Sequence, residues 1–351
     1  MATLYLATLE GPNGFAKPCV VKRIRSAFSN RESFRQMLGR EARVAALLSH
    51  PNIVQVFDFG EIDGENFLSM EYVEGASMRA ILRQARRDAR PLSLAEVAYV
   101  GTAMADALDY IHSGVDLDGQ RTPLVHRDVS PSNILVSDRG AVKLTDFGIV
   151  KVLQAPGLTD AGVVKGKYGY MSPEQVKGQH LDGRSDLFAL GAVLWEMLTD
   201  RPLFRRPDVA ATIAAVLAGR VPRLTDVAPE APAVMEPILE RALAADRRQR
   251  YPSARALHDA LAALVPSDEL AEARRSLAQR AATAESEVDT DSWTGDILRT
   301  DDAFVGASSG SLARPLLEDD DEDDGLGTAV WVGLVTAAVV ASVLVWWIVL
   351  R

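Results

Sequence analysis

The chain has 351 residues, of which 48% are hydrophobic and 25% charged, enough for a globular core. Its net charge of −10 is concentrated, because residues 266–328 hold 17 acidic and 5 basic side chains and the first 265 residues are nearly neutral. This balance argues against a nucleic-acid-binding surface, and the single cysteine, Cys19, excludes an intramolecular disulfide. We expect no cleavable signal peptide, since the N-terminus lacks a charged segment followed by an apolar one.

The first 75 residues predict strands with one helix among them. Alternating or β-branched runs predict strands over Thr3–Leu9, Pro18–Ile24, Ile53–Phe59 and Asn66–Tyr72. Helical spacing of apolar residues predicts a helix over Asn30–Ser49, which Pro51 ends.

From Ser77 onward helices dominate. A Ser-x-x-Glu capping box opens the first long one, Ser93–Ser113. Further helices are predicted over Arg184–Thr199, Val209–Ala218, Val234–Ala244 and Ser253–Leu264. The layout is α+β: a small β-rich lobe over 1–75 and a larger helical lobe over 76–265.

Beyond residue 265 the composition changes. We predict an acidic, mostly disordered linker over 266–328, within which Ser267–Ala284 has helical spacing. Glu318–Asp324 is a run of seven acids, read as a solvated spacer. Ala329–Leu350 has 22 residues without a charge and tryptophans near both ends, which predicts a single transmembrane helix.

Two motifs carry the chemistry. The first runs from His126 to Asn133 and precedes a strand-like stretch, and the second is Asp146-Phe147-Gly148. Phosphoryl transfer needs alignment, a metal ion and charge neutralisation more than covalent help. Asp128 can orient an attacking hydroxyl and accept its proton, while Asn133 and Asp146 offer hard oxygen ligands suited to Mg²⁺.

In order and spacing these motifs resemble those of the protein kinase family, specifically the bacterial eukaryotic-like (Hanks-type) Ser/Thr kinases with an HRDVSP pattern. The resemblance covers residues 1 to about 265 and implies a bilobal kinase fold that binds ATP with Mg²⁺ or Mn²⁺. It implies that Asp128 is the catalytic base and that Asn133 and Asp146 hold the metal.

The resemblance also assigns the nucleotide site. Lys22 resembles the lysine that holds the ATP phosphates, and Glu41 is its expected partner, completing the catalytic set. Met70, Glu71 and Val73 resemble the hinge beside the adenine, with Val20 and Leu135 as further ATP-binding positions.

Other positions resemble the family's structural residues. Glu174 should pair with Arg250, and Asp186 should brace the catalytic loop. His126, Arg127, Phe147 and Gly148 fall in the same structural group. Thr159, in the segment between Gly148 and Tyr170, is the expected activating phosphosite, whose phosphate would bind Arg127; an ordinary exposed threonine is the alternative.

The sequence departs from the family at several points, among them Val20 in place of the usual alanine over the adenine. The Gly-rich loop is missing, because Met1–Ala7 resembles only its end; either the true start lies upstream or the chain is truncated. Ser130 replaces the usual lysine two residues after Asp128, and Lys167 stands where a threonine commonly contacts that aspartate.

The sequence therefore predicts a bacterial Ser/Thr protein kinase that phosphorylates protein substrates and itself. The alternative is a pseudokinase scaffold weakened by the missing loop. We expect a single-pass protein of the inner membrane with its kinase domain in the cytoplasm. Its partners would be ATP, protein substrates and the membrane but no nucleic acid, and a homodimer is left open.

Overall fold

A computed structural model describes residues 2–24, 44–62, 65–117, 120–146, 167–284 and 297–298. The chain divides into two compact units. The first combines Met1–Gln36, Val56–Tyr72 and Thr294–Arg351, and the second combines Met37–Gln55 and Val73–Trp293. Each is described by itself.

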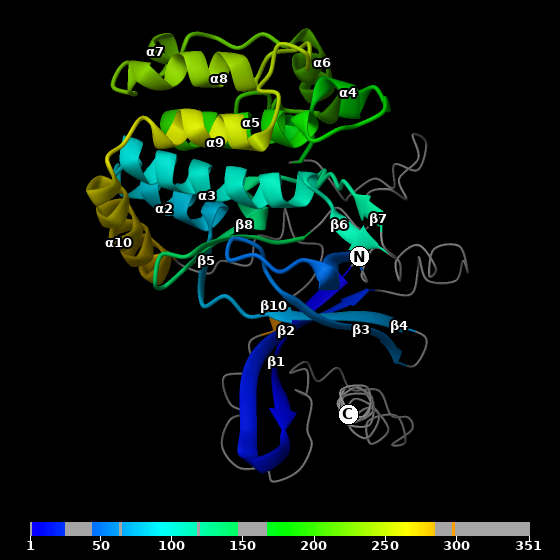
Figure 1. Ribbon diagram of the computed structural model, residues 1–351. Coiled ribbons are helices and arrows are strands. Elements are labelled where there is room, and N and C mark those ends of the chain that lie inside the picture. Colours follow the sequence, from blue (N-terminus) through cyan, green and yellow to red (C-terminus); the bar gives the residue numbers. More distant parts are fainter. Residues whose placement is uncertain are drawn as a thin grey trace, which may run out of the picture. The chain divides into compact units, whose positions relative to one another are not determined.

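The first unit is a five-stranded sheet in the order β10-β1-β2-β4-β3 (Figure 1). Its strands are β1 (Ala2–Gly11), β2 (Phe15–Ile24), β3 (Val56–Ile62), β4 (Glu65–Glu71) and the two-residue β10 (Ile297–Leu298). β10 joins β1 in parallel, so two residues of the predicted linker belong to this sheet. The other pairs are antiparallel.

A tight turn, η1 (Pro12–Gly14), connects β1 to β2. Asn13 and Gly14 both have positive φ, 61° and 76°, which is the backbone that lets an Asn-Gly pair close a hairpin with the natural strand twist. The strand predicted over Ile53–Phe59 begins later than expected. Residues 53–54 belong to the second unit and not to this sheet. There, Val54 N–H donates to Leu144 O at 2.9 Å.

Of the helix predicted over Asn30–Ser49, the structure describes only the end. Residues 44–47 are helical, and Ala45 and Leu48 are buried. Glu41 lies outside the described residues.

The second unit begins with β5 (Gly75–Ser77), which pairs with β8 (Ile134–Ser137), and β8 pairs in turn with β9 (Val142–Leu144). A separate hairpin joins β6 (Val115–Leu117) to β7 (Gln120–Thr122). Neither β5 nor this hairpin was predicted, because three-residue strands have too little periodicity to detect.

Helices form the body of the second unit (Figure 1). The longer ones are α2 (Met78–Arg87), α3 (Leu94–His112), α5 (Arg184–Thr199), α6 (Val209–Ala218), α8 (Glu236–Ala242), α9 (Ala254–Ala262) and α10 (Ser267–Thr283). Short turns are η3 (Pro131–Asn133), η5 (Lys167–Tyr170), α4 (Pro173–Val176), α7 (Leu224–Val227) and η6 (Ala233–Met235). The helix predicted over Val234–Ala244 is thus split into η6 and α8.

The core lies around α5, in which every residue after Arg184 is buried, as expected of a helix apolar on all sides. α3 packs closely against it, since a Cβ added at Gly101 would lie 3.1 Å from Leu194 and 2.9 Å from Leu261. The predicted capping box is present: Glu96 N–H donates to Ser93 Oγ, and Ser93 N–H donates to Glu96 Oε2.

α10 extends the folded body beyond the predicted boundary at residue 265. Leu277 is fully buried, with Ala273 and Ala281 one turn away on either side. Arg280 Nε donates to Glu96 Oε1 at 2.7 Å, so the helix docks on the N-terminus of α3. The predicted helix is therefore present, but it is part of the helical unit and does not belong to the linker.

No helix among the described ranges is long and apolar enough to cross a membrane. The predicted span Ala329–Leu350, the acidic run Glu318–Asp324 and most of the predicted linker lie outside those ranges.

Candidate active site

The segment from His126 to Asn133 lies between β7 and β8. Asp186, near the start of α5, holds this segment through hydrogen bonds to its backbone. Asp186 Oδ2 accepts from His126 N–H and its Oδ1 from Arg127 N–H, both at 2.8 Å. His112 Nε2 lies 2.8 Å from Oδ2. Burial would raise the pKa of Asp186, but these partners hold it below its ordinary value. An ionised, fully buried carboxylate thus fixes the loop.

Two residues of the candidate site have an unusual backbone conformation. Arg127 has φ 66°, in the left-handed region that side chains with a Cβ avoid, and Asp146 after β9 has φ 57°. Such angles occur where the surrounding structure holds them, and they gather at functional sites.

Asn133 and Asp146, the predicted metal ligands, lie at adjacent ends of the β8–β9 hairpin. Thr145 N–H donates to Asn133 O at 2.9 Å, so the residue before Asp146 touches Asn133. Asn133 Nδ2 donates to Asp128 O at 2.7 Å, which brings the predicted base into the same cluster.

The oxygen of the Asn133 amide suits a metal. Oδ1 is buried and has no hydrogen-bond partner among the described residues, while Nδ2 is engaged. The described ranges hold no cluster of three or more His, Cys, Asp or Glu that could bind a metal by themselves. An amide oxygen plus one carboxylate fits Mg²⁺, which is bound by few protein ligands and completes its shell with phosphates and water.

Lys167, at the start of η5, pairs directly with the predicted base. Its Nζ lies 2.9 Å from Asp128 Oδ2, and both side chains are largely buried, 19% and 10% exposed. Ser130 lies in the same loop, fully buried, and its Oγ has no partner within the described residues. η5 therefore supplies a cation to Asp128.

A second contact joins the loop that carries Asp128 to the chain after η5, and the sequence does not predict it. Gln175, in α4, donates from Nε2 to Arg127 O at 2.8 Å and also completes a capping box with Ser172. The Ser-x-x-Gln spacing could have indicated the box, but nothing in the sequence indicates the bond to the loop.

Glu174 and Arg250, predicted to pair, form a bidentate ion pair. Arg250 NH1 and NH2 donate to the two Glu174 oxygens at 2.6 and 2.9 Å, and Ser185 Oγ donates to Oε1. Burial would raise the pKa of Glu174, but these hydrogen bonds outweigh it and lower the pKa. The pair joins α4 to the segment before α9.

Of the residues predicted to bind the nucleotide, some belong to the first unit and some to the second. In the first, Val20 and Lys22 share one face of β2, and Val20 lies opposite Met70 of β4; Glu71 is the last residue of β4. In the second, Val73 precedes β5 and Leu135 lies on β8. Phe147, Gly148 and Thr159 lie outside the described residues.

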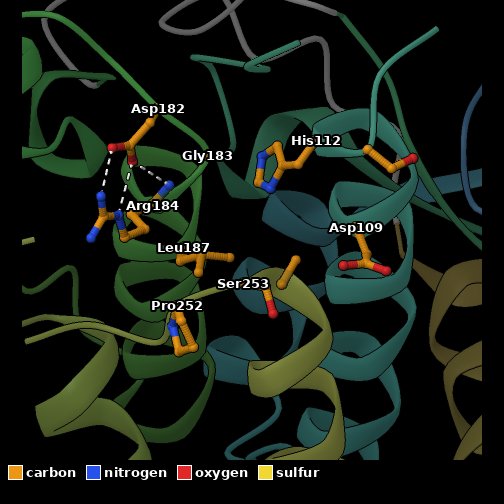
Figure 2. Close-up of a pocket in the computed structure, with 10 residues that line it drawn as sticks. Asp109, His112, Asp182, Gly183, Arg184, Leu187, Pro252 and Ser253 are labelled. Carbon is orange, nitrogen blue, oxygen red and sulfur yellow. Dashed lines mark hydrogen bonds and ion pairs between the residues drawn. The ribbon is translucent and has the colours of Figure 1, made fainter. Parts of the chain in front are cut away.

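A pocket of about 430 Å³ opens elsewhere in the second unit, where the end of α3 meets the starts of α5 and α9 (Figure 2). Asp109, His112, Asp182 and Arg184 line it, and none of the predicted catalytic residues does. Its link to the site is His112, which also contacts Asp186.

The profile of the protein kinase domain matches residues 13–261. Tyrosine-protein kinase MasK of Myxococcus xanthus is 41% identical over 261 residues, which are 74% of this chain and 40% of MasK. Serine/threonine-protein kinase PknD of Mycobacterium tuberculosis is 36% identical over 246 residues, 69% of this chain and 35% of PknD. The chain thus spans less than half the length of these relatives.

Among solved structures, the kinase domain of Mycobacterium tuberculosis PknI is 30% identical and superposes with a TM-score of 0.55 over 74% of this chain and 90% of the crystallised domain. The match supports a protein kinase fold for the β-rich unit and the helical unit described above. The loop held by Asp186, the Asn133–Asp146 pair and these similarities together lead to one conclusion: the chain belongs to the protein kinase family.

Proposed function

We propose that this chain is an ATP-dependent protein kinase that transfers the γ-phosphoryl group of ATP to hydroxyl groups of proteins, including its own. The observation that carries the proposal is the cluster of Asp128, Asn133 and Asp146, with the buried Asn133 Oδ1 left without a partner among the described residues. That arrangement provides a base and a metal site within one loop and hairpin.

Each residue has a role in this proposal. When bound, ATP with Mg²⁺ or Mn²⁺ supplies the phosphoryl donor and neutralises its charge. Asp128 orients the acceptor hydroxyl and takes its proton, Asn133 and Asp146 hold the metal, and Lys22 holds the phosphates. Asp186 keeps the loop in place through its two backbone hydrogen bonds.

Serine and threonine are the acceptors that we propose, as in the name of PknD. Tyrosine, the acceptor in the name of MasK, is the competing possibility. Phosphoamino-acid analysis of the labelled protein separates them.

The decisive experiment is autophosphorylation with γ-labelled ATP, with Asp128→Asn as the matched control because it keeps the shape of the side chain and removes its basicity. We expect label on the wild type and at least about 100-fold less on the variant, the usual contribution of a general base. If the wild type carried no more label than the variant, the proposal would be overturned, and the alternative of a pseudokinase scaffold would be favoured.

We also propose that Ala329–Leu350 anchors the protein in the inner membrane, with the kinase domain in the cytoplasm where ATP is available. The support is its 22-residue uncharged length, about 33 Å as a helix, with Trp331, Trp346 and Trp347 near its ends. The full chain should sediment with membranes and resist salt extraction, whereas a chain lacking 329–350 should not. Equal distribution of the two would contradict the anchor.

Phosphorylation of Thr159 is the activation step that we propose. Arg127 Nε is buried and has no hydrogen-bond partner among the described residues, which suits a residue that receives an anion. Thr159→Ala should lower activity about 10-fold or more, while an exposed threonine in α10, Thr283→Ala, should leave it unchanged. Undiminished activity of Thr159→Ala would refute the step.

A further inference from the structure

The charges of three arginines act on one buried carboxyl of α5. Glu196 of α5 is only 8% exposed, and the hydroxyl of Tyr170 donates to its Oε2. Burial raises the pKa of Glu196, and Arg79, Arg86 and Arg205 act in the opposite direction. Arg79 and Arg86 belong to α2, and Arg205 belongs to the segment after α5.

Arg79 connects this place to the catalytic loop. Its Nε donates to Ser132 Oγ at 2.7 Å, and Ser132 directly precedes Asn133. Asn133 Nδ2 donates to Asp128 O at 2.7 Å, so Arg79 contacts the same loop that carries Asp128.

Arg205 lies on the other side, against η5. A Cβ added at Gly169 would be 3.4 Å from Arg205 N, and η5 begins with Lys167, the partner of Asp128. Arg205 and the following Arg206 are both exposed. Arg79, Arg205 and Arg206 are called the arginine rim below.

The acidic side chains of this area are already engaged. Glu196 is buried under Tyr170, Asp200 pairs with Arg86 at 2.9 Å, and Asp208 caps α6 by accepting from Ala211 N–H. The surface left for a substrate is therefore positive, and it has no free carboxylate within the described residues to hold a basic side chain.

We propose that the arginine rim recognises acidic side chains close to the phosphoacceptor, so that the preferred substrates are hydroxyls flanked by Asp or Glu. This inference rests on the proposed function and specifies its substrate class. Arginine–carboxylate contacts are strong, directional and frequently bidentate, which makes them suited to select a sequence.

The chain itself contains such sequences. Thr290 stands between Asp289 and Asp291, and Thr300 is followed by Asp301 and Asp302. The acidic tail would then be a substrate of its own kinase domain.

The test uses three peptides built on residues 285–293 that differ only in the residues flanking the hydroxyls: acidic as in the chain, neutral with Asn and Gln, or basic with Lys. We expect kcat/KM for the acidic peptide to exceed that for the neutral one at least about 10-fold and to fall with added salt. Arg205→Glu should remove most of this preference. Arg223→Ala, a 78% exposed arginine before α7, is the matched control and should change nothing.

Binding provides a readout independent of catalysis. The fluorescently labelled acidic peptide should bind Asp128→Asn more tightly than the neutral peptide, and Arg205→Glu in that background should abolish the difference. Equal use and equal binding of the two peptides, or a preference that survives Arg205→Glu, would overturn the inference while the kinase activity stands. Failure to label any peptide or the chain itself would overturn the proposed function, and the inference with it.

Discussion

Lys167 and Asp128 form a contact of 2.9 Å at a place where charge governs phosphoryl transfer. The lysine contacts the carboxylate and, in the proposed function, would add a positive charge beside the acceptor hydroxyl. Lys167→Ala should therefore lower kcat about 10- to 100-fold with a smaller change in KM for ATP, whereas Lys167→Arg should keep most of the activity.

A second variant distinguishes this role from simple structural support. Ser130→Lys in the Lys167→Ala background returns a lysine to the catalytic loop, and we expect it to restore part of kcat. Lys177→Ala, an exposed lysine after α4, is the control. Full activity of Lys167→Ala would show that the ion pair has no part in the reaction.

Residues in sequence motifs could be identified before the structure was known, and so could the Glu174–Arg250 pair and the role of Asp186, which the family resemblance implies. Contacts across the fold that belong to no family motif could not. Asp128, Asn133 and Asp146 lie in two short motifs whose spacing is distinctive. The bonds from Gln175 to Arg127 and from His112 to Asp186 join residues 48 and 74 positions apart. Such contacts depend on how the helices pack, which local pattern does not encode.

At the scale of elements, α10 has the clearest energetic role. Leu277 is fully buried against the rest of the unit. Gly140 between β8 and β9 has φ 74°, and a Cβ there would lie 2.2 Å from Arg274 O, so the helix and the hairpin are in direct contact. Leu277→Ala should lower the free energy of unfolding by about 2–5 kcal/mol, as for other buried leucines.

Urea unfolding followed by circular dichroism measures this loss. Leu217→Ala, at a leucine that is 40% exposed on α6, is the control and should cost far less. Equal effects of the two substitutions would mean that α10 contributes little to the stability of the helical unit.

Several helices were predicted almost to the residue. Arg184–Thr199 and Val209–Ala218 match α5 and α6, and Ser93 and Ser253 are the N-caps of α3 and α9. The sequence places α10 in the linker because only two alanines and one leucine of this helix are buried. Small residues let helices approach closely, but they carry little hydrophobic signal.

At the scale of the whole molecule, buried ionisable groups set the response to pH. Burial lowers the pKa of His126 and, although Asp106 opposes it, that of His50. The folded state then binds fewer protons than the unfolded state below about pH 6.5, so stability is complete above that pH and decreases as the pH falls. Glu174 and Asp186, whose pKa values are also lowered, add to the loss in the acid range; Glu196, whose pKa is raised, opposes it.

The expected slope below pH 6.5 is at most about 1.4 kcal/mol per pH unit for each buried histidine. Urea unfolding at pH 7.5, 6.5 and 5.5 measures it. His126→Phe should flatten the slope, and His258→Asn, at a half-exposed position on α9, should not. A slope unchanged in His126→Phe would assign the acid sensitivity to other groups.

The left-handed backbone at Arg127 and Asp146 has a consequence for engineering. A residue with a Cβ costs roughly 1–2 kcal/mol in that conformation, whereas glycine adopts it freely. Glycine at either position would relieve this strain, and at Asp146 it would also remove the carboxylate proposed to hold the metal. A screen for thermostable variants of this protein should therefore select for phosphorylation at the same time.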